Sequence, residues 1–99
     1  MMELKDYDIL SDFTEQTATR YVTFISPSVH RFDLAIISTE RFYGKKIVID
    51  LQSGRCGTLS YEDLEEADVL QNVFRITDEQ AAELAQFLML VLGPAHFAE

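Results

Sequence analysis

The 99-residue chain has one cysteine, two prolines, four glycines and no tryptophan. A single cysteine, Cys56, excludes an intrachain disulfide framework and a zinc site built on cysteines. The low glycine and proline content, with 47% hydrophobic residues, excludes collagen-like, low-complexity and disordered chains. The longest apolar run, Phe87 to Leu92, is far shorter than the ~20 residues of a membrane span. The N-terminus has no apolar signal-peptide core. We therefore expect one globular domain over residues 1–99, located in the cytoplasm and without membrane contact.

Positive charge is also scarce, with 8 Lys and Arg against 17 Asp and Glu and a net charge of −9. The imbalance is uneven along the chain. Residues 1–19 hold one Lys and five acids, residues 20–55 hold six cations and three acids, and residues 56–99 hold one Arg and nine acids. Phosphate binding requires net positive surface, so nucleic acid is not an expected partner.

Alternating apolar residues predict four strands, because strand side chains point to opposite faces in turn. The predicted strands run over Thr17–Ser26, His30–Ser38, Lys45–Leu51 and Arg55–Leu59. The second is apolar on both faces at its end, which places it centrally in the sheet. The connections are short, so an antiparallel meander is expected, with Gly54 at a positive-φ turn position and Gly57 as a bulge. A fifth strand or a connector is expected at Asn72–Ile76.

Helical patterns dominate the last third of the chain. Ser60 and Asp63 suggest a helix start, with a short acidic helix over Tyr61 to about Val69. Thr77 and Gln80 form a capping box for a long amphipathic helix that ends at Gly93 and Pro94. The fold class that follows is α+β, with a four-stranded, possibly five-stranded, antiparallel meander sheet covered on one face by the C-terminal helix.

The two ends of the chain carry weaker patterns. Leu4, Tyr7, Leu10 and Phe13 recur at every third position of residues 1–16, which favours one or two helical turns; a docked irregular arm is the alternative. Residues 94–99, which include His96, are expected to form a frayed tail.

Five stretches of the chain carry a resemblance to a known family. They read TEQTATRYVTF, RFDLAII, FYGKKIVIDLQSGR, LSYEDLEE and DEQAAELAQFL. The order resembles a family of short, acidic Firmicutes proteins of unknown function, over about Tyr7 to Leu92. The resemblance implies a bacterial cytosolic domain, and it carries over no activity, cofactor or catalytic residue.

Catalytic and metal sites find little support in the sequence. Cys56 and His30 are the residue types of a nucleophile and a base, but nothing places them together, and a buried strand cysteine with a turn histidine is the favoured interpretation. The acidic run from Glu62 to Asp68 lacks the spacing of a metal site and is interpreted as a solvated helix face. We predict no catalytic residues, no metal and no cofactor.

The most unusual local segment joins the second and third predicted strands. It contains Arg41, Phe42, Tyr43, Gly44, Lys45 and Lys46. Aromatic residues beside cations can anchor a partner protein or stack on bases, whereas the plainer interpretation is a hairpin loop whose aromatics close the end of the core. We call Arg41–Lys46 the interaction loop and predict Arg41, Phe42, Tyr43, Lys45 and Lys46 as its contact residues.

The last helix has more apolar surface than one sheet can cover. Its core stripe accounts for Leu88, Val91 and Leu92, and leaves Phe87, Met89 and Leu90 on its flank. Either the N-terminal arm or a second subunit is expected to cover them. We predict Phe87, Met89 and Leu90 as the interface of a homodimer, since two-fold dimers are the commonest oligomers.

Two functions follow from these patterns. The first is a non-catalytic protein-interaction module that self-associates and presents the interaction loop to a protein partner. The alternative is a small-ligand or nucleotide-binding domain, possibly an enzyme. In it Arg31, Arg41, Lys45 and Arg55 would line a cationic pocket at one end of the sheet, with Asp50 or Glu40 as acid or base.

Overall fold

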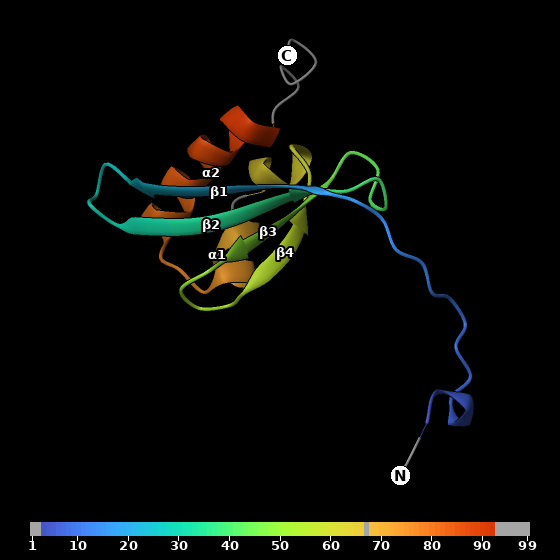
Figure 1. The fold of residues 1–99 in the computed structure, drawn as a ribbon. Helices are drawn as coiled ribbons and strands as arrows, with labels where there is room; N and C mark the ends of the chain where they lie inside the picture. The colour runs from blue at the N-terminus through green and yellow to red at the C-terminus, as the bar shows by residue number, and fades with distance from the viewer. Residues whose placement is uncertain (1–2, 67, 93–99) are drawn as a thin grey trace.

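A computed structural model describes residues 3–66 and 68–92. Figure 1 shows its elements in chain order. They are η1 (Leu4–Asp6), β1 (Ala18–Ile25), β2 (Arg31–Ser38), β3 (Lys46–Asp50), β4 (Cys56–Leu59), η2 (Glu62–Glu65), α1 (Val69–Phe74) and α2 (Asp78–Leu92). The α+β class predicted from the sequence is confirmed.

The four strands form an antiparallel meander in the order β1-β2-β3-β4, as predicted. Ala35 of β2 pairs with Tyr21 of β1 on one side and with Ile49 of β3 on the other. Ile49 in turn pairs with Cys56 of β4. The register therefore places these four residues in one row across the sheet. Paired residues in an antiparallel sheet point to the same face, so these four side chains share one face. Successive residues along each strand alternate between the two faces, so the face of every other position follows from this row.

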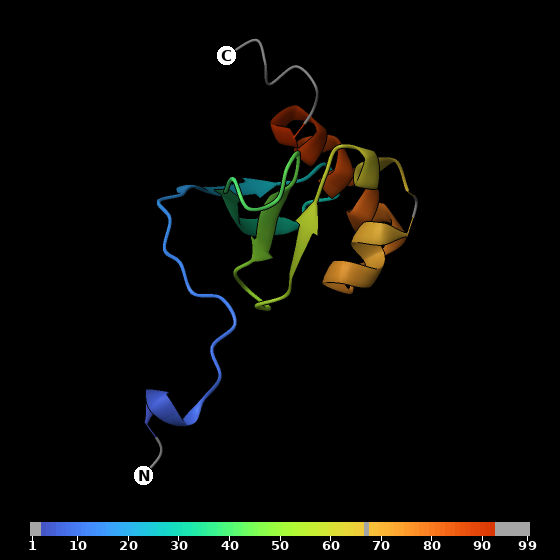
Figure 2. The same cartoon turned by 90° about the vertical axis from the view of Figure 1, so that its right-hand side faces the viewer.

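The helices cover one face of the sheet and leave the other uncovered (Figure 2). Ile36 and Val48, paired on the central strands, share one buried cluster with Leu88 of α2, and all three side chains are almost fully buried. The rest of the buried apolar core is Phe32, Leu34, Leu59, Leu64, Leu70, Phe74, Ala81, Leu84, Val91 and Leu92. The predicted cover by the C-terminal helix is confirmed, and η2 and α1 extend it.

The capping box that starts α2 is present. The backbone N–H of Gln80 donates to Thr77 Oγ1, and the backbone N–H of Thr77 donates to Gln80 Oε1, both at 3.1 Å. These bonds occupy donors that the first helical turn would otherwise leave unpaired. The predicted stop at Gly93 and Pro94 lies outside the described residues.

The predictions for residues 61–76 were wrong in part. The acidic stretch forms only the 3-10 turn η2, in which Leu64 is the buried residue. The next helix is α1, which buries Leu70 and Phe74 at i, i+4 spacing and ends at Arg75 in the left-handed conformation, φ 59°. No fifth strand forms at Asn72–Ile76, and the predicted connector is limited to Arg75 and Ile76, because Asn72 to Phe74 belong to α1. Burial of one short apolar helix face outweighs the β-propensity of its residues.

The glycines of the last hairpin have different roles. Gly54 has a φ of 81°, as predicted for the turn. Gly57 is not a bulge, since the β3–β4 register continues without interruption through Val48 opposite Gly57. A Cβ atom on Gly57 would lie 2.8 Å from Cγ1 of Val73. The absence of a side chain at Gly57 therefore lets Val73 of α1 pack closely against β4.

The N-terminal arm, residues 3–17, is neither a continuous helix nor docked on the sheet. After η1 it is extended, and every side chain described from Lys5 to Thr17 is exposed. It leaves the domain at the end of the sheet where the interaction loop lies, and projects away from it (Figure 1). Among the described helices, none has the length and apolar character needed to cross a membrane.

Candidate interaction surfaces

The interaction loop follows β2 and precedes β3, so it lies at one end of the sheet. Its turn is closed by the Lys45 N–H, which donates to the Phe42 carbonyl at 3.1 Å, with Gly44 at φ 72°. Phe42 is half-buried, whereas Tyr43 is 99% exposed. Phe42 is therefore partly covered by its surroundings, whereas the side chain of Tyr43 lies in solvent.

The base of the N-terminal arm is fixed to the residues beside this loop. Glu15 accepts hydrogen bonds from the Thr39 hydroxyl at 2.7 Å and from the Glu40 backbone N–H at 3.2 Å. These bonds, the Thr39 hydroxyl first, hold the pKa of Glu15 below its ordinary value. The Arg41 guanidinium lies 4.7 Å from the centre of the Phe13 ring, within cation–π range. We call the contacts of Glu15 with Thr39 and Glu40 the Glu15 clasp. No pattern in the sequence predicts it, because its partners are 24 or more residues apart.

The four cations proposed to line one pocket do not converge. Arg41 and Lys45 belong to the loop end of the sheet, where Ser38 pairs with Lys46. Arg31 starts β2 and Arg55 precedes β4, so both lie at the opposite end. The antiparallel register therefore divides the set into two pairs, and the four-cation pocket is a wrong prediction.

A smaller hollow does lie beside the interaction loop. It measures about 290 Å³, just below the usual range for small-molecule sites. Its walls are formed by Ser38, Thr39, Glu40, Phe42, Tyr43, Gly44, Lys45, Lys46 and Leu92. Two lysines and two aromatic rings are thus gathered there. Glu40, proposed as an acid or base, is exposed at its rim, and Asp50 belongs to the other end of the sheet.

The flank of α2 is covered unevenly. Phe87 stacks on Phe24 of β1 with ring centroids 4.0 Å apart, and Met89 packs partly against the core. Leu90 is 83% exposed. It lines a shallow groove between α2 and the end of β1, together with Phe24, Ile25, Ser26, Pro27, Glu83, Gln86 and Phe87. Of the three residues predicted from the sequence, Leu90 is the one left in water.

We call the uncovered side of the sheet the open face. The solvated face of an antiparallel sheet is usually polar, whereas this one is largely apolar. Two complete rows cross it: Tyr21, Ala35, Ile49 and Cys56 in one, and Thr19, Ile37, Ile47 and Thr58 in the other. No charged side chain interrupts them. The two-sided apolar character of β2 was predicted from the sequence, whereas this surface was not.

One end of the open face is closed by a polar cluster around Asp33. Its carboxylate accepts from the Thr23 hydroxyl and from Gln52 Nε2, each at 2.6 Å, and pairs with Arg31 Nε at 3.1 Å. The bond from Thr23, followed by that from Gln52, holds the pKa of Asp33 below its ordinary value. The charge of Arg31 is therefore largely engaged within the chain.

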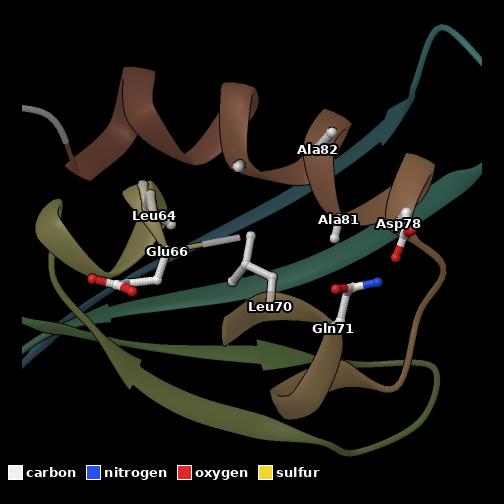
Figure 3. Close-up of a pocket in the computed structure, with 8 residues that line it drawn as sticks. Leu64, Glu66, Leu70, Gln71, Asp78, Ala81 and Ala82 are labelled. Atoms are coloured by element: carbon white, nitrogen blue, oxygen red, sulfur yellow. The ribbon is translucent and has the colours of Figure 1, made fainter. Parts of the chain in front are cut away.

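A further hollow separates α2 from η2 and α1 (Figure 3). Leu64, Leu70 and Ala81 form its apolar wall. Gln71 and Asp78 point into the space at one end, and Glu66 lies at the other. The residues around it include two carboxylates and no cation, histidine or cysteine, so no nucleophile–base pair is assembled in this part of the described chain.

Cys56 and His30 lie on opposite faces of the sheet. Cys56 is exposed on the open face, so the expectation of a buried cysteine was wrong. Cys56 begins the short edge strand β4, and its side chain lies on the face that no helix covers. His30 lies on the helix side, where its Nδ1 is 3.0 Å from Gln80 Nε2 and its ring meets Phe32 edge-on. Within residues 3–66 and 68–92, no three metal-binding side chains come together.

Fold and surfaces together define a small two-layer α+β domain whose distinctive features are an extended arm, an aromatic loop and an open sheet face. The family model described as SAV0927-like matches residues 10–90, which is most of the chain. The chain belongs to the SAV0927-like family, an uncharacterised family. A search of curated proteins finds no match.

Proposed function

We propose that this protein is a non-catalytic interaction module that self-associates, with Leu90, Phe87 and Met89 at a contact between copies. The observation that carries the proposal is Leu90, 83% exposed on α2 beside a groove. Burying a leucine side chain is worth about 1.5–3 kcal/mol, so a partner that covers this flank gains stability. Met89 and Phe87, already half-buried, would form the edge of the contact.

Sedimentation equilibrium across the micromolar range tests this proposal. The wild-type chain is expected to show a mass above that of one copy, rising with concentration. Leu90→Asp should shift association to at least tenfold higher concentration. Ala82→Asp, which places the same charge at an exposed position of the same helix, is the matched control and should leave the mass curve unchanged. A single-copy mass for the wild type at every concentration contradicts self-association.

The interaction loop is proposed as the surface for a protein partner. Tyr43 supports this role, because it is 99% exposed between Phe42 and Lys45, and tyrosine with basic neighbours is enriched in protein interfaces. Once a partner is purified, Tyr43→Ala should weaken its binding while leaving the melting temperature unchanged. If the wild type and Tyr43→Ala bind the partner with equal affinity, the interaction loop is not part of the interface.

A second candidate function is the binding of a small anionic ligand, and the hollow beside the interaction loop favours it. Lys45 and Lys46 supply charge there, and Phe42 and Tyr43 supply ring faces. A thermal-shift screen of nucleotides and phosphorylated metabolites tests this candidate. A compound that raises the melting temperature of the wild type but not of Lys45→Ala supports it, whereas no response to any compound contradicts it.

A cytoplasmic location is part of the proposal. The thiol of Cys56 is free and exposed, and such thiols persist in the reducing cytosol. No activity needing a cofactor is proposed. The bacterial, Firmicutes origin suggested by the resemblance stays a prediction.

A further inference from the structure

We propose that two copies of this chain join at the outer edge of β1, which pairs antiparallel with the same strand of the second copy and makes one continuous sheet. The inference rests on the proposed function, because it takes the same self-association and includes the same Leu90 flank of α2. It adds a backbone ladder with a defined register. Its evidence is the direction of the backbone groups along β1 and the position of Leu90 beside that strand.

The outer edge of β1 is long and has few features that would keep another strand away. In the described part of the chain β1 pairs with β2 alone (Figure 1). Its eight residues pair with β2 without a bulge or a proline, over about 27 Å at the usual rise of a strand. Natural proteins usually protect such edges with lysines, prolines, bulges or short strands. The opposite edge strand, β4, is protected in this way, because it has four residues.

Printed hydrogen bonds on either side of β2 fix which backbone groups of β1 point outward. The Ser26 N–H donates to the His30 carbonyl at 2.9 Å, and such hydrogen-bonded pairs recur at every second position of an antiparallel ladder. The Leu51 N–H donates to the Asp33 carbonyl at 2.8 Å, so the backbone of Asp33 faces β3 rather than β1, in agreement with this alternation. The backbone groups that point away from β2 therefore belong to Thr19, Tyr21, Thr23 and Ile25.

These four outward residues are spaced symmetrically about Val22, and this symmetry defines the register. When β1 lies antiparallel to its copy with Val22 opposite Val22, Thr19 lies opposite the partner's Ile25. Tyr21 then lies opposite the partner's Thr23. All four outward residues fall in hydrogen-bonded pairs, so each outward N–H and C=O has an acceptor or a donor. The arrangement is two-fold symmetric, as most protein dimers are.

The side chains of β1 suit this register. Arg20 is the one charged residue of the strand, and it lies opposite the partner's Phe24, so like charges do not face each other across the ladder. Tyr21 and Ile25, on the open face, are 74% and 60% exposed. A neighbouring strand would cover part of both, because side chains of paired residues contact each other.

A second copy, rather than a foreign strand, is the occupant that also covers Leu90. Phe87 of α2 stacks on Phe24 of β1, and the groove lined by Leu90 lies between α2 and the end of β1. The other side of α2, which includes Ala81, faces η2 and α1 (Figure 3). Leu90 therefore lies on the β1 side of its helix. Paired residues share a face, so a copy joined at β1 places its own α2 on the same side of the sheet, with the two Leu90 flanks toward each other.

A cysteine at the symmetry position tests the register. In a Cys56→Ser background, which removes the chain's one cysteine, Val22→Cys is expected to form a disulfide-linked dimer under mild oxidation. Opposed residues in a non-hydrogen-bonded pair have Cα atoms about 4.5 Å apart, within the range that a disulfide spans. Arg20→Cys in the same background is the matched control on the same face of the same strand. Its two copies would lie about 14 Å apart and should stay unlinked on a non-reducing gel.

A proline tests the backbone ladder. Thr19→Pro removes one outward N–H and none of the hydrogen bonds between β1 and β2, so the fold should be retained. Sedimentation equilibrium should show association shifted to at least tenfold higher concentration. Thr19→Ala removes the same side chain and keeps the N–H, so its association should match the wild type. Melting temperatures of both variants check the fold.

The outcomes separate this inference from the proposed function. If the wild type associates and Leu90→Asp weakens association, while Val22→Cys stays unlinked and Thr19→Pro behaves as Thr19→Ala, the helix flank is the contact and the edge of β1 is not. Linkage of Arg20→Cys in place of Val22→Cys overturns the register. A wild type that is a single copy at all concentrations overturns both proposals. If Thr19→Pro alone then loses a purified partner protein, the edge takes a strand of that partner instead.

Discussion

Both carboxylate oxygens of Glu83 on α2 accept hydrogen bonds from Ser28, in the turn between β1 and β2. Oε1 accepts from the Ser28 hydroxyl at 2.7 Å and Oε2 accepts from the Ser28 backbone N–H at 3.0 Å. The two residues are 55 positions apart in the chain. This contact fixes the far end of the first hairpin to the long helix, and so sets the position of β1 over Phe87.

We predict that the hydrogen bonds of Glu83 make the free energy of unfolding depend on pH. The hydroxyl of Ser26, followed by that of Ser28, holds the pKa of Glu83 below its ordinary value of 4.5. A carboxylate with a lowered folded-state pKa stabilises the fold above its unfolded value, and this contribution disappears as pH falls through the folded value. Glu83→Gln should therefore be less stable than wild type at pH 7, and the difference should vanish at acid pH below the lowered pKa. Urea denaturation at both pH values measures it; Glu65→Gln, exposed on η2, should show no such difference.

The clasp of Glu15 gives a prediction for the arm. Its pKa is lowered by the Thr39 hydroxyl and the Glu40 N–H, so the clasp is intact at neutral pH and opens as pH falls through the lowered value. Glu15→Ala should increase hydrogen exchange of the Glu40 amide at neutral pH, as followed by NMR. Asp12→Ala, on the exposed arm, is the control. An unchanged Glu40 exchange rate would mean that the clasp does not hold the arm in solution.

The close approach of α1 to β4 predicts a coupled pair of substitutions. Gly57→Ala places a Cβ 2.8 Å from Val73 Cγ1, which is overpacking and should cost about 1–3 kcal/mol of unfolding free energy. In a Val73→Ala background that methyl group is absent, and the added cost of Gly57→Ala should become small. A double-mutant cycle by urea denaturation measures the coupling. Additive losses would show that Val73 is not the cause.

Val29 predicts a stabilising substitution. It follows the turn at Ser26–Ser28, has a φ of 64° and is 79% exposed. A β-branched residue in the left-handed region is strained, at a cost on the order of 1 kcal/mol. Val29→Gly should therefore raise the unfolding free energy by a similar amount despite the loss of a side chain, and Val29→Ala, which keeps a Cβ, should recover less. Thermal and urea denaturation give the comparison.

Local patterns predicted the elements whose formation depends on nearby residues. The four strands, their order and the capping box of Thr77 and Gln80 follow from alternation, short connections and a three-residue spacing. The pattern failed at α1, where a six-residue helix is stabilised by burial of Leu70 and Phe74 rather than by its own propensity. It also failed at Gly57, whose neighbour Val73 is remote in the chain.

The candidate surfaces divide in the same way. Surplus apolar residues on the last helix were readable from its 3.6-residue period, but Phe24 covers Phe87, and Leu90 alone stays exposed. The interaction loop was readable as a cluster of aromatic and basic residues, although the exposure of Tyr43 was not. The open face was missed, because its members come from four strands and are joined only by the register.

By itself, the sequence determined the fold class, the succession of strands and the start of the final helix, since each depends on interactions among residues close in the chain. Tertiary structure decided which apolar side chains stay in water, where the cations lie and how the arm leaves the domain. Those outcomes depend on contacts between residues tens of positions apart, such as Glu15 with Thr39 and Glu83 with Ser28. Such contacts have no period or spacing along the chain, and they exist only once the sheet and helices have packed.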